Sequence, residues 1–390
     1  MLVLSRILFI ISLIVLIFSS QITVYAKIEP KLALKSEAAV LLDSETNAVL
    51  YNKNADKKMY PASLTKIATA IYAIEKGNLD SIATISAYAV RQDGTRVYLV
   101  EGEKVPLKKL VQGMLINSGN DAAVAVAEQV DGSVEQFSKH INDYLKTTIG
   151  IQHTHFTNPS GLFDKNHYTT AQDMALITNY AIKNPLFMEI FGTKKLHWKG
   201  KSWETNILSH HKMLLGEYPF AGITGGKTGY TTESKQTLST TADNGKIKLT
   251  AVVLRSDLKR DKYDDTALLF DYGFQSFKHG MIKQGEIFKQ GEKEFFPDKD
   301  IFVTEDVQGT TKEISDDGVL SIKNHKGYVL QMVELKQLEP KPAIVPEKIP
   351  EVKVKEKEYK GNESYVFYGL LLAAFAAFLF GTVKKFPKKY

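Results

Sequence analysis

The stretch from Tyr60 to Gly77, YPASLTKIATAIYAIEKG, constrains the fold most, because it predicts a helix with one buried face. Its apolar residues recur at the i, i+3, i+4, i+7 spacing of such a face, at Ile67, Ala70, Ile71 and Ile74. Ser63 and Lys66 stand at its start, three residues apart, which places both side chains on one side of a helix. The first helical turn favours acidic side chains, because the macrodipole is positive there. A lysine at this place therefore needs an explanation.

Two interpretations of this pair remain open from the stretch alone. Ser63 can be an N-cap, with Lys66 a solvated first-turn residue. Alternatively, Ser63 Oγ and Lys66 Nζ share a hydrogen bond, and Lys66 acts as a base if burial lowers its pKa. The S-x-x-K spacing also arises by chance, so more of the chain is needed to choose.

The chain has 390 residues and no cysteine. This length allows two domains with appendages. The lack of cysteine excludes disulfides, thiolate zinc sites and cysteine nucleophiles, and it leaves the redox compartment undetermined.

The N-terminus predicts a secretory signal peptide over residues 1–26. One early charge, Arg6, precedes the apolar run Ile7–Phe18, and Val24-Tyr25-Ala26 resembles a small-residue cleavage site. An uncleaved N-terminal anchor is the alternative, because the basic region is thin.

The C-terminus predicts a transmembrane anchor over residues 364–383. Its uncharged part, Tyr365–Val383, has 19 residues, enough to span a hydrocarbon core of about 30 Å as a helix. The basic residues 384–390 follow as a cytoplasmic tail under the positive-inside rule. The body is then expected at the extracytoplasmic face of the cell membrane. A helix lying in the membrane plane is disfavoured, because the run has no polar face.

Most of the formal net charge of +6 belongs to the C-terminal part. Residues 341–390 carry 10 lysines and 5 glutamates, a balance of +5, so the remainder is nearly neutral. No nucleic acid partner is expected from such a body. Within this part, residues 341–363 mix prolines with Lys and Glu and predict an extended linker.

Between the two ends, the patterns alternate between strand and helix. Residues 36–52 predict a hairpin, and 120–130, 133–149 and 171–184 predict helices. Residues 234–242 and 246–254 predict a second hairpin, because Asn244-Gly245 supplies the positive φ of a tight turn. After residue 275 the chain is charged and turn-rich, so residues 27–275 and a small β-rich domain over 276–340 are expected as separate domains.

Two further triplets change the interpretation of Ser63. Ser118-Gly119-Asn120 begins the helix predicted at 120–130, and Lys227-Thr228-Gly229 lies on the strand before the second hairpin. S-x-x-K, S-x-N and K-T-G in this order resemble the motif set of penicillin-binding proteins and serine β-lactamases. The flanking sequences INSGNDAAVAVAE, THFTNPSGLFDKNHYTTAQDMALI and GITGGKTGYTTES resemble low-molecular-mass D-alanyl-D-alanine carboxypeptidases, over about residues 30–275.

The resemblance implies an α/β (α+β) catalytic domain like that of these enzymes, with a central antiparallel sheet flanked by helices. A small all-β domain and a C-terminal transmembrane helix would follow. The implied activity is a serine-type carboxypeptidase that removes the terminal D-alanine from peptidoglycan stem pentapeptides and binds β-lactams covalently. It implies no cofactor and no metal.

The resemblance also assigns roles. Ser63 is the nucleophile, Lys66 accepts its proton, and Ser118 relays protons. Asn120 holds the substrate backbone. The binding residues on the strand are Lys227, Thr228, Gly229 and Tyr230: Lys227 and Thr228 bind the terminal carboxylate, and the backbone N–H groups of Ser63 and Tyr230 form the oxyanion hole.

One position departs from the family. An arginine that often helps to bind the substrate carboxylate would fall on Lys262, with Arg260 two residues earlier. Lysine lacks the bidentate guanidinium fork, so the replacement is not conservative. Either Arg260 takes this role or carboxylate binding is weaker; both remain open.

Three rival functions follow from the same sequence. The histidines at 153, 155, 167, 210 and 211 offer parts for a zinc peptidase, but no helical H-E-x-x-H is present. A β-lactamase of class A would carry a deacylating glutamate near residues 153–170, where only Asp164 is acidic. A catalytically inactive wall-binding protein is the third, and the three intact motifs give it no support.

Overall fold

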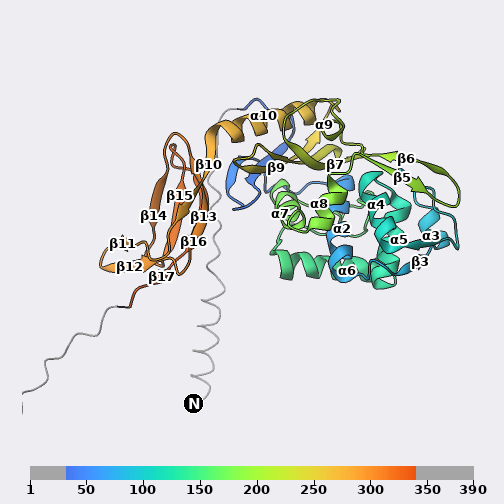
Figure 1. The fold of residues 1–390 in the computed structure, drawn as a ribbon, viewed down its shortest axis with the longest axis horizontal. Coiled ribbons are helices and arrows are strands. Elements are labelled where there is room, and N and C mark those ends of the chain that lie inside the picture. Colours follow the sequence, from blue (N-terminus) through green and yellow to red (C-terminus); the bar gives the residue numbers. More distant parts are fainter. Residues whose placement is uncertain (1–31, 340–390) are drawn as a thin grey trace, which may run out of the picture. The chain divides into compact units, whose positions relative to one another are not determined.

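The computed structural model describes residues 32–339, and its centre is a five-stranded antiparallel sheet (Figure 1). The strand order is β2-β1-β9-β8-β7, so that β7 forms one edge. The strands are β1 (Ala38–Asp43), β2 (Val49–Lys53), β7 (Ile223–Thr231), β8 (Lys235–Asp243) and β9 (Lys248–Ser256).

The central strands are buried on both faces, which explains their continuous apolar runs. Along β1, Val40 and Leu42 belong to the core beneath the helical region, whereas Leu41 belongs to the core beneath α10 (Asp261–Ser276). This alternation is the period of two along a pleated strand. The sheet therefore separates two hydrophobic cores.

Helices form the larger core with one face of the sheet. The 3₁₀ turn η1 (Ala62–Leu64) runs directly into α2 (Thr65–Lys76), whose predicted apolar face is buried. The other elements of this part are β3 (Ile82–Thr84), α3 (Ala87–Val90), β4 (Lys104–Pro106), α4 (Leu107–Ile116), α5 (Asn120–Asp131), α6 (Val134–Tyr144), the π-helical turn η2 (Leu145–Ile149), α7 (Ala171–Ala181), α8 (Pro185–Phe191), β5 (Lys195–Lys199), β6 (Glu204–Leu208) and α9 (Lys212–Leu215).

After α10 the described chain contains only strands. They are β10 (Phe277–Ile282), β11 (Phe288–Gln290), β12 (Lys293–Phe296), β13 (Ile301–Asp306), β14 (Thr311–Ile314), β15 (Val319–Lys323), β16 (Val329–Glu334) and β17 (Lys336–Gln337). A small core around Phe295 and Val303 holds them together. Asp43 at the end of β1 is fully buried and accepts hydrogen bonds from His279 Nε2 at 2.9 Å and Thr304 Oγ1 at 2.8 Å.

The catalytic part contains the hairpins and helices that the sequence predicts. The two hairpins and the three further helices are present, and the α+β arrangement with a central antiparallel sheet is confirmed. The helix α10 was not predicted, because its charged first turn hides its apolar positions. The predicted signal peptide, linker 341–363, anchor 364–383 and basic tail lie outside the described residues. Within residues 32–339, no helix is long and apolar enough to cross a membrane.

Candidate active site

Ser63 lies in the 3₁₀ turn before α2, where three backbones meet. Ala62 has a φ of +49°, a conformation that costs a non-glycine residue energy. Gly229 of β7 passes so close that a Cβ there would lie 3.0 Å from Ala62 Cβ, and a Cβ on Gly161 would overlap the Ala62 carbonyl. The glycines of K-T-G and of the loop at 158–162 thus allow both segments to approach the serine turn.

The side chain of Lys66 is completely buried and points at Ser63. Its Nζ lies 3.0 Å from Ser63 Oγ, 2.7 Å from Asn120 Oδ1 and 2.6 Å from the Ser160 carbonyl oxygen. Asn120 Nδ2 donates to the Asp93 carbonyl at 2.6 Å, which fixes Oδ1 as the atom that faces the lysine. Two of the three neighbours of Nζ can therefore only accept hydrogen bonds.

This coordination suits Lys66 in both protonation states. An ammonium donates to all three oxygens, whereas a neutral amine keeps two N–H donors for Asn120 and Ser160 and turns its lone pair to the Ser63 hydroxyl. Burial holds the pKa of Lys66 well below its ordinary value, and the charge of Lys227 lowers this pKa further, while Asp121 acts in the opposite direction. The arrangement therefore suits a proton acceptor for Ser63.

The second serine stands between α4 and α5, on a strained backbone. Ser118 has a φ of +62°, and Lys227 Nζ donates to its Oγ at 2.9 Å. Burial, together with the nearby charge of Lys262, lowers the pKa of Lys227 to about 7. A lysine that gains or loses its proton near neutral pH thus contacts the Ser118 hydroxyl.

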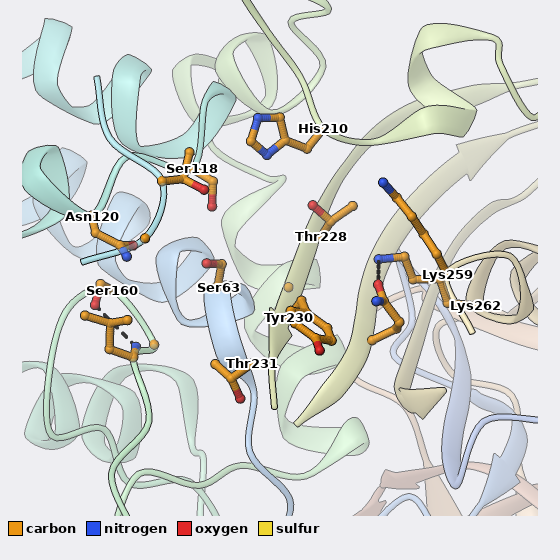
Figure 2. A pocket seen from close by; sticks show the side chains of 16 residues that line it. Ser63, Ser118, Asn120, Ser160, His210, Thr228, Tyr230, Thr231, Lys259 and Lys262 are labelled. Atoms are coloured by element: carbon orange, nitrogen blue, oxygen red, sulfur yellow. Dashed lines mark hydrogen bonds between the residues drawn. The ribbon is translucent and has the colours of Figure 1, made fainter. Parts of the chain in front are cut away.

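These groups surround one cavity of about 480 Å³. Figure 2 shows Ser63 between Asn120 and Ser160 on one side and Tyr230 on the other. The expected site residues that line it are Ser63, Ser118, Asn120, Thr228, Gly229, Tyr230 and Lys262. Lys66 and Lys227 are buried in its walls. None of the described lining residues carries a carboxylate.

One side of the cavity is basic. Lys262 lines it and donates to Gln236 Oε1 at 2.8 Å, and burial lowers its pKa to about 7, with a further contribution from the charge of Lys259. Arg260 instead projects outward and pairs with Asp264, with its Nε 3.4 Å from the carboxylate. Of the two residues that the sequence left open, the structure thus places Lys262 at the cavity.

Nine lining residues were not among the expected site residues: Gly94, Thr95, Ser160, Gly161, Leu162, His210, Thr231, Gln236 and Lys259. Four of them, Ser160, His210, Gln236 and Lys259, bring polar side chains to the cavity from four different connections or strands. For Ser160 the sequence carried a signal, because segment 158–161 is a run of turn residues. Burial, together with the charges of Lys227 and Lys259, lowers the pKa of His210 to about 4, so its imidazole is neutral at pH 7.

The sequence matches the model of one protein family. The model of the D-alanyl-D-alanine carboxypeptidase family, peptidase S11, matches residues 24–257, which is more than half of the chain. The chain belongs to this family.

Individual relatives support the same family. This chain is 32% identical over 326 residues to the D-alanyl-D-alanine carboxypeptidase DacF of Bacillus subtilis, and the match covers 79% of this chain and 83% of that protein. The crystal structure of the carboxypeptidase DacD from Francisella tularensis has a TM-score of 0.67 at 24% identity, over 82% of this chain and 96% of that one. A D-alanyl-D-alanine carboxypeptidase from Mycobacterium tuberculosis has a TM-score of 0.60 at 27% identity, over 64% and 95%. The penicillin-binding-protein-like fold is therefore confirmed.

The histidines of the carboxypeptidase that suggested a zinc site have other partners. His167 is buried between Thr65 and Thr157, and burial lowers its pKa to about 3. His211 contacts Thr240 Oγ1 at 2.7 Å. Within residues 32–339, no group of three or more His, Asp or Glu side chains is arranged to hold a metal ion.

Proposed function

We propose that the chain hydrolyses the bond between the last two D-alanines of peptidoglycan stem pentapeptides through an acyl-enzyme on Ser63. The observation that carries this proposal is the buried amine of Lys66, 3.0 Å from Ser63 Oγ, with its two other neighbours able only to accept. A serine with an adjacent neutral base is an activated nucleophile.

In the first step, Ser63 Oγ attacks the penultimate D-alanine carbonyl carbon while its proton passes to Lys66 Nζ. The carbonyl oxygen becomes an oxyanion, which the backbone N–H groups of Ser63 and Tyr230 stabilise. Collapse of this intermediate breaks the C–N bond. The leaving amine takes up, through the Ser118 hydroxyl, the proton that Lys66 received, and Lys66 returns to its neutral form. Lys227 Nζ donates to the same hydroxyl at 2.9 Å.

The terminal carboxylate lies on the basic side of the cavity in this proposal. Lys227 and Thr228 bind it, together with Lys262. Because Lys262 has a pKa of about 7 in the empty cavity, an arriving carboxylate favours its charged form. Binding of substrate therefore takes up protons. Asn120 holds the peptide on the other side of the scissile bond.

Water then hydrolyses the acyl-enzyme, again with Lys66 as the base. A class A β-lactamase places a glutamate beside this water, and no described lining residue of the cavity is acidic. β-Lactams are consequently expected to acylate Ser63 and to be released slowly. The proposal also includes secretion by residues 1–26 and anchoring by residues 364–383, with the enzyme at the extracytoplasmic face of the cell membrane, beside its wall substrate.

Mass spectrometry of purified muropeptides tests the activity. Incubation with the protein should convert pentapeptides into tetrapeptides with release of one D-alanine. A fluorescent penicillin, run on the same samples, should label the wild type. Labelling without D-alanine release would favour an inactive wall-binding protein, and rapid release of hydrolysed penicillin would favour a β-lactamase.

A further inference from the structure

A second cavity, of about 300 Å³, is lined chiefly by cations and plays no part in the chemistry above. Lys57, Lys58, Lys165 and Arg255 line it, and Glu233 is the one acidic lining residue in the described chain. The aromatic rings of Tyr60 and Tyr168 also line it, together with Met59 and Ser234.

We call the cavity around Ser63 the reaction cavity and the cavity around Lys58 and Lys165 the basic cavity. Three segments of the chain run from the wall of one to the wall of the other. Tyr60 lines the basic cavity three residues before Ser63. Leu162 lines the reaction cavity, and Lys165 lines the basic cavity. Phe163, between them, packs edge-on against Tyr60, with the two ring centres 5.0 Å apart.

The third segment is the end of β7 and the turn after it. Thr231 lines the reaction cavity and Ser234 the basic cavity, and the Thr231 N–H donates to Ser234 Oγ at 2.9 Å. The two cavities are thus neighbours along one path.

With the terminal carboxylate at Lys262, as proposed above, we expect the substrate residues ahead of the scissile bond to extend past Thr231, toward the basic cavity. Figure 2 shows Thr231 and His210 on opposite sides of Ser63, with Lys259 and Lys262 on a third side. Tyr60 and Ser63 are three residues apart, so their Cα atoms are separated by at most about 11 Å. Two or three extended substrate residues ahead of the scissile bond cover this distance.

The charges of the cavity are only partly neutralised. Glu37 pairs with Lys57 at 2.5 Å and with Arg255 at 3.1 Å. Lys58 Nζ lies 4.3 Å from the centre of the Tyr168 ring, and within residues 32–339 the side chain of Lys165 makes no hydrogen bond or ion pair. Lys58 and Lys165 are therefore the cations available to a ligand.

The backbone around Arg255 supports a built site. Arg255 has a φ of +58° and lies at an irregularity of the β8–β9 pairing, between the pairs Gln236–Ser256 and Leu238–Val253. Bulges of this kind redirect a side chain and persist near functional sites. Here the bulge directs Arg255 to Glu37, at the rim of the basic cavity.

We propose that this cavity is a specificity site for a carboxylate on the substrate peptide, two or three residues ahead of the scissile bond. The proposal rests on the carboxypeptidase function above. Partly exposed lysines attract a carboxylate with modest strength each, and the attraction is sensitive to salt. The site thus selects among peptides and takes no part in bond cleavage.

Matched peptides test this proposal with the full-length protein in detergent. One peptide ends in D-Ala-D-Ala and carries glutamate two residues ahead of the scissile bond, and its partner carries glutamine there. We expect kcat/KM to be about 3- to 10-fold higher for the glutamate peptide, a preference that high salt reduces. The same pair with the acid one residue farther away tests the distance.

Variants assign the preference to the cavity. Lys58→Gln and Lys165→Gln should each lower the glutamate-to-glutamine ratio, and the double variant should bring it close to one. Lys246→Gln, in the exposed β8–β9 turn, is the matched control and should keep the wild-type ratio. A charge reversal, Lys165→Glu, should favour the glutamine peptide.

Two results would overturn the inference. One is a wild-type ratio of one for both peptide pairs, and the other is an unchanged ratio in the double variant. Penicillin labelling of Ser63 separates these results from failure of the proposed function, because labelling uses a ligand without the distant carboxylate. A protein that labels and cleaves without carboxylate preference refutes only the specificity site.

Discussion

A buried lysine amine, three residues after a serine, is the residue-scale feature from which the chemistry follows. Lys66 is fully buried, and when its amine is neutral the two obligate acceptors leave its lone pair for Ser63 Oγ, 3.0 Å away. Acylation needs both Ser63 and Lys66. Replacing either one should therefore reduce the acylation step itself, whereas replacing a binding residue should mainly weaken substrate binding.

Ser63→Ala should abolish both D-alanine release and penicillin labelling, because no other hydroxyl in the cavity adjoins the base. The measurement is gel fluorescence with a labelled penicillin beside the muropeptide assay. Labelling that survives in Ser63→Ala would move the nucleophile to another residue, and Ser118 would be the next to replace.

Lys66→Arg should reduce the acylation rate about 10²- to 10⁴-fold, the usual contribution of a general base. Guanidinium keeps the positive charge but stays protonated, so it cannot take the proton of Ser63. Stopped-flow acylation by a chromogenic β-lactam measures this rate. Near wild-type acylation would reduce Lys66 to an electrostatic role.

The depressed pKa values also predict a pH dependence of stability. Lys227 and Lys262 have pKa values of about 7 in the fold and about 10.5 when unfolded. Between these values the unfolded chain binds more protons, so the free energy of unfolding should rise with pH, by up to about 1.4 kcal/mol per unit for each lysine.

Urea unfolding between about pH 7 and pH 9 measures this slope. Lys262→Met removes one of the two groups and raises the pKa of Lys227, which loses a neighbouring charge, so the slope should become smaller. An identical slope in wild type and Lys262→Met would contradict the assigned protonation states.

At the scale of elements, the site depends on how closely β7 passes the serine turn. Gly229→Ala would place a Cβ 2.3 Å from Thr237 Oγ1 and 3.0 Å from both Ala62 Cβ and the Pro61 carbonyl. Either β7 or Thr237, which donates to the Pro61 carbonyl, must then move, and we expect penicillin acylation to slow at least about tenfold, because a displacement near 1 Å beside the serine turn is costly to catalysis.

Gly245→Ala is the control for this effect. Gly245 lies in the β8–β9 turn with a φ of +80° and open space around it. Its replacement should cost about 1 kcal/mol of stability through backbone strain alone, and acylation should keep its rate. Thermal unfolding and acylation, measured on both variants, separate the two mechanisms.

The elements also show what the sequence could predict. Local patterns predicted α2, α5 and the β8–β9 hairpin, because the spacing of apolar residues and the turn residues can be recognised within short stretches of sequence. The motif order located Ser63, Ser118 and Lys227. His210 and Lys259 were missed because the β6–α9 and β9–α10 connections meet only in the folded chain. The orientation of the first turn of α10 likewise decides that Lys262, and not Arg260, lies at the cavity, and the sequence does not show this orientation.

At the scale of the whole molecule, the remaining prediction concerns the anchor. A chain that ends before Tyr365 should be released into solution and keep its turnover of a small D-Ala-D-Ala peptide, because the apolar run carries no catalytic group. The full-length protein should resist alkaline carbonate and require detergent for extraction. Full-length protein in the carbonate wash would show that Tyr365–Val383 does not span the bilayer.

The left-handed backbone at Ala62 and Ser118 has a consequence for how this enzyme can change. Each residue holds a conformation in which glycine would be more relaxed, and each flanks or carries a working hydroxyl. Glycine at either position should therefore raise the thermal stability of the protein. Ser118→Gly would also remove the hydroxyl, so at that position the more durable enzyme should be the less active one.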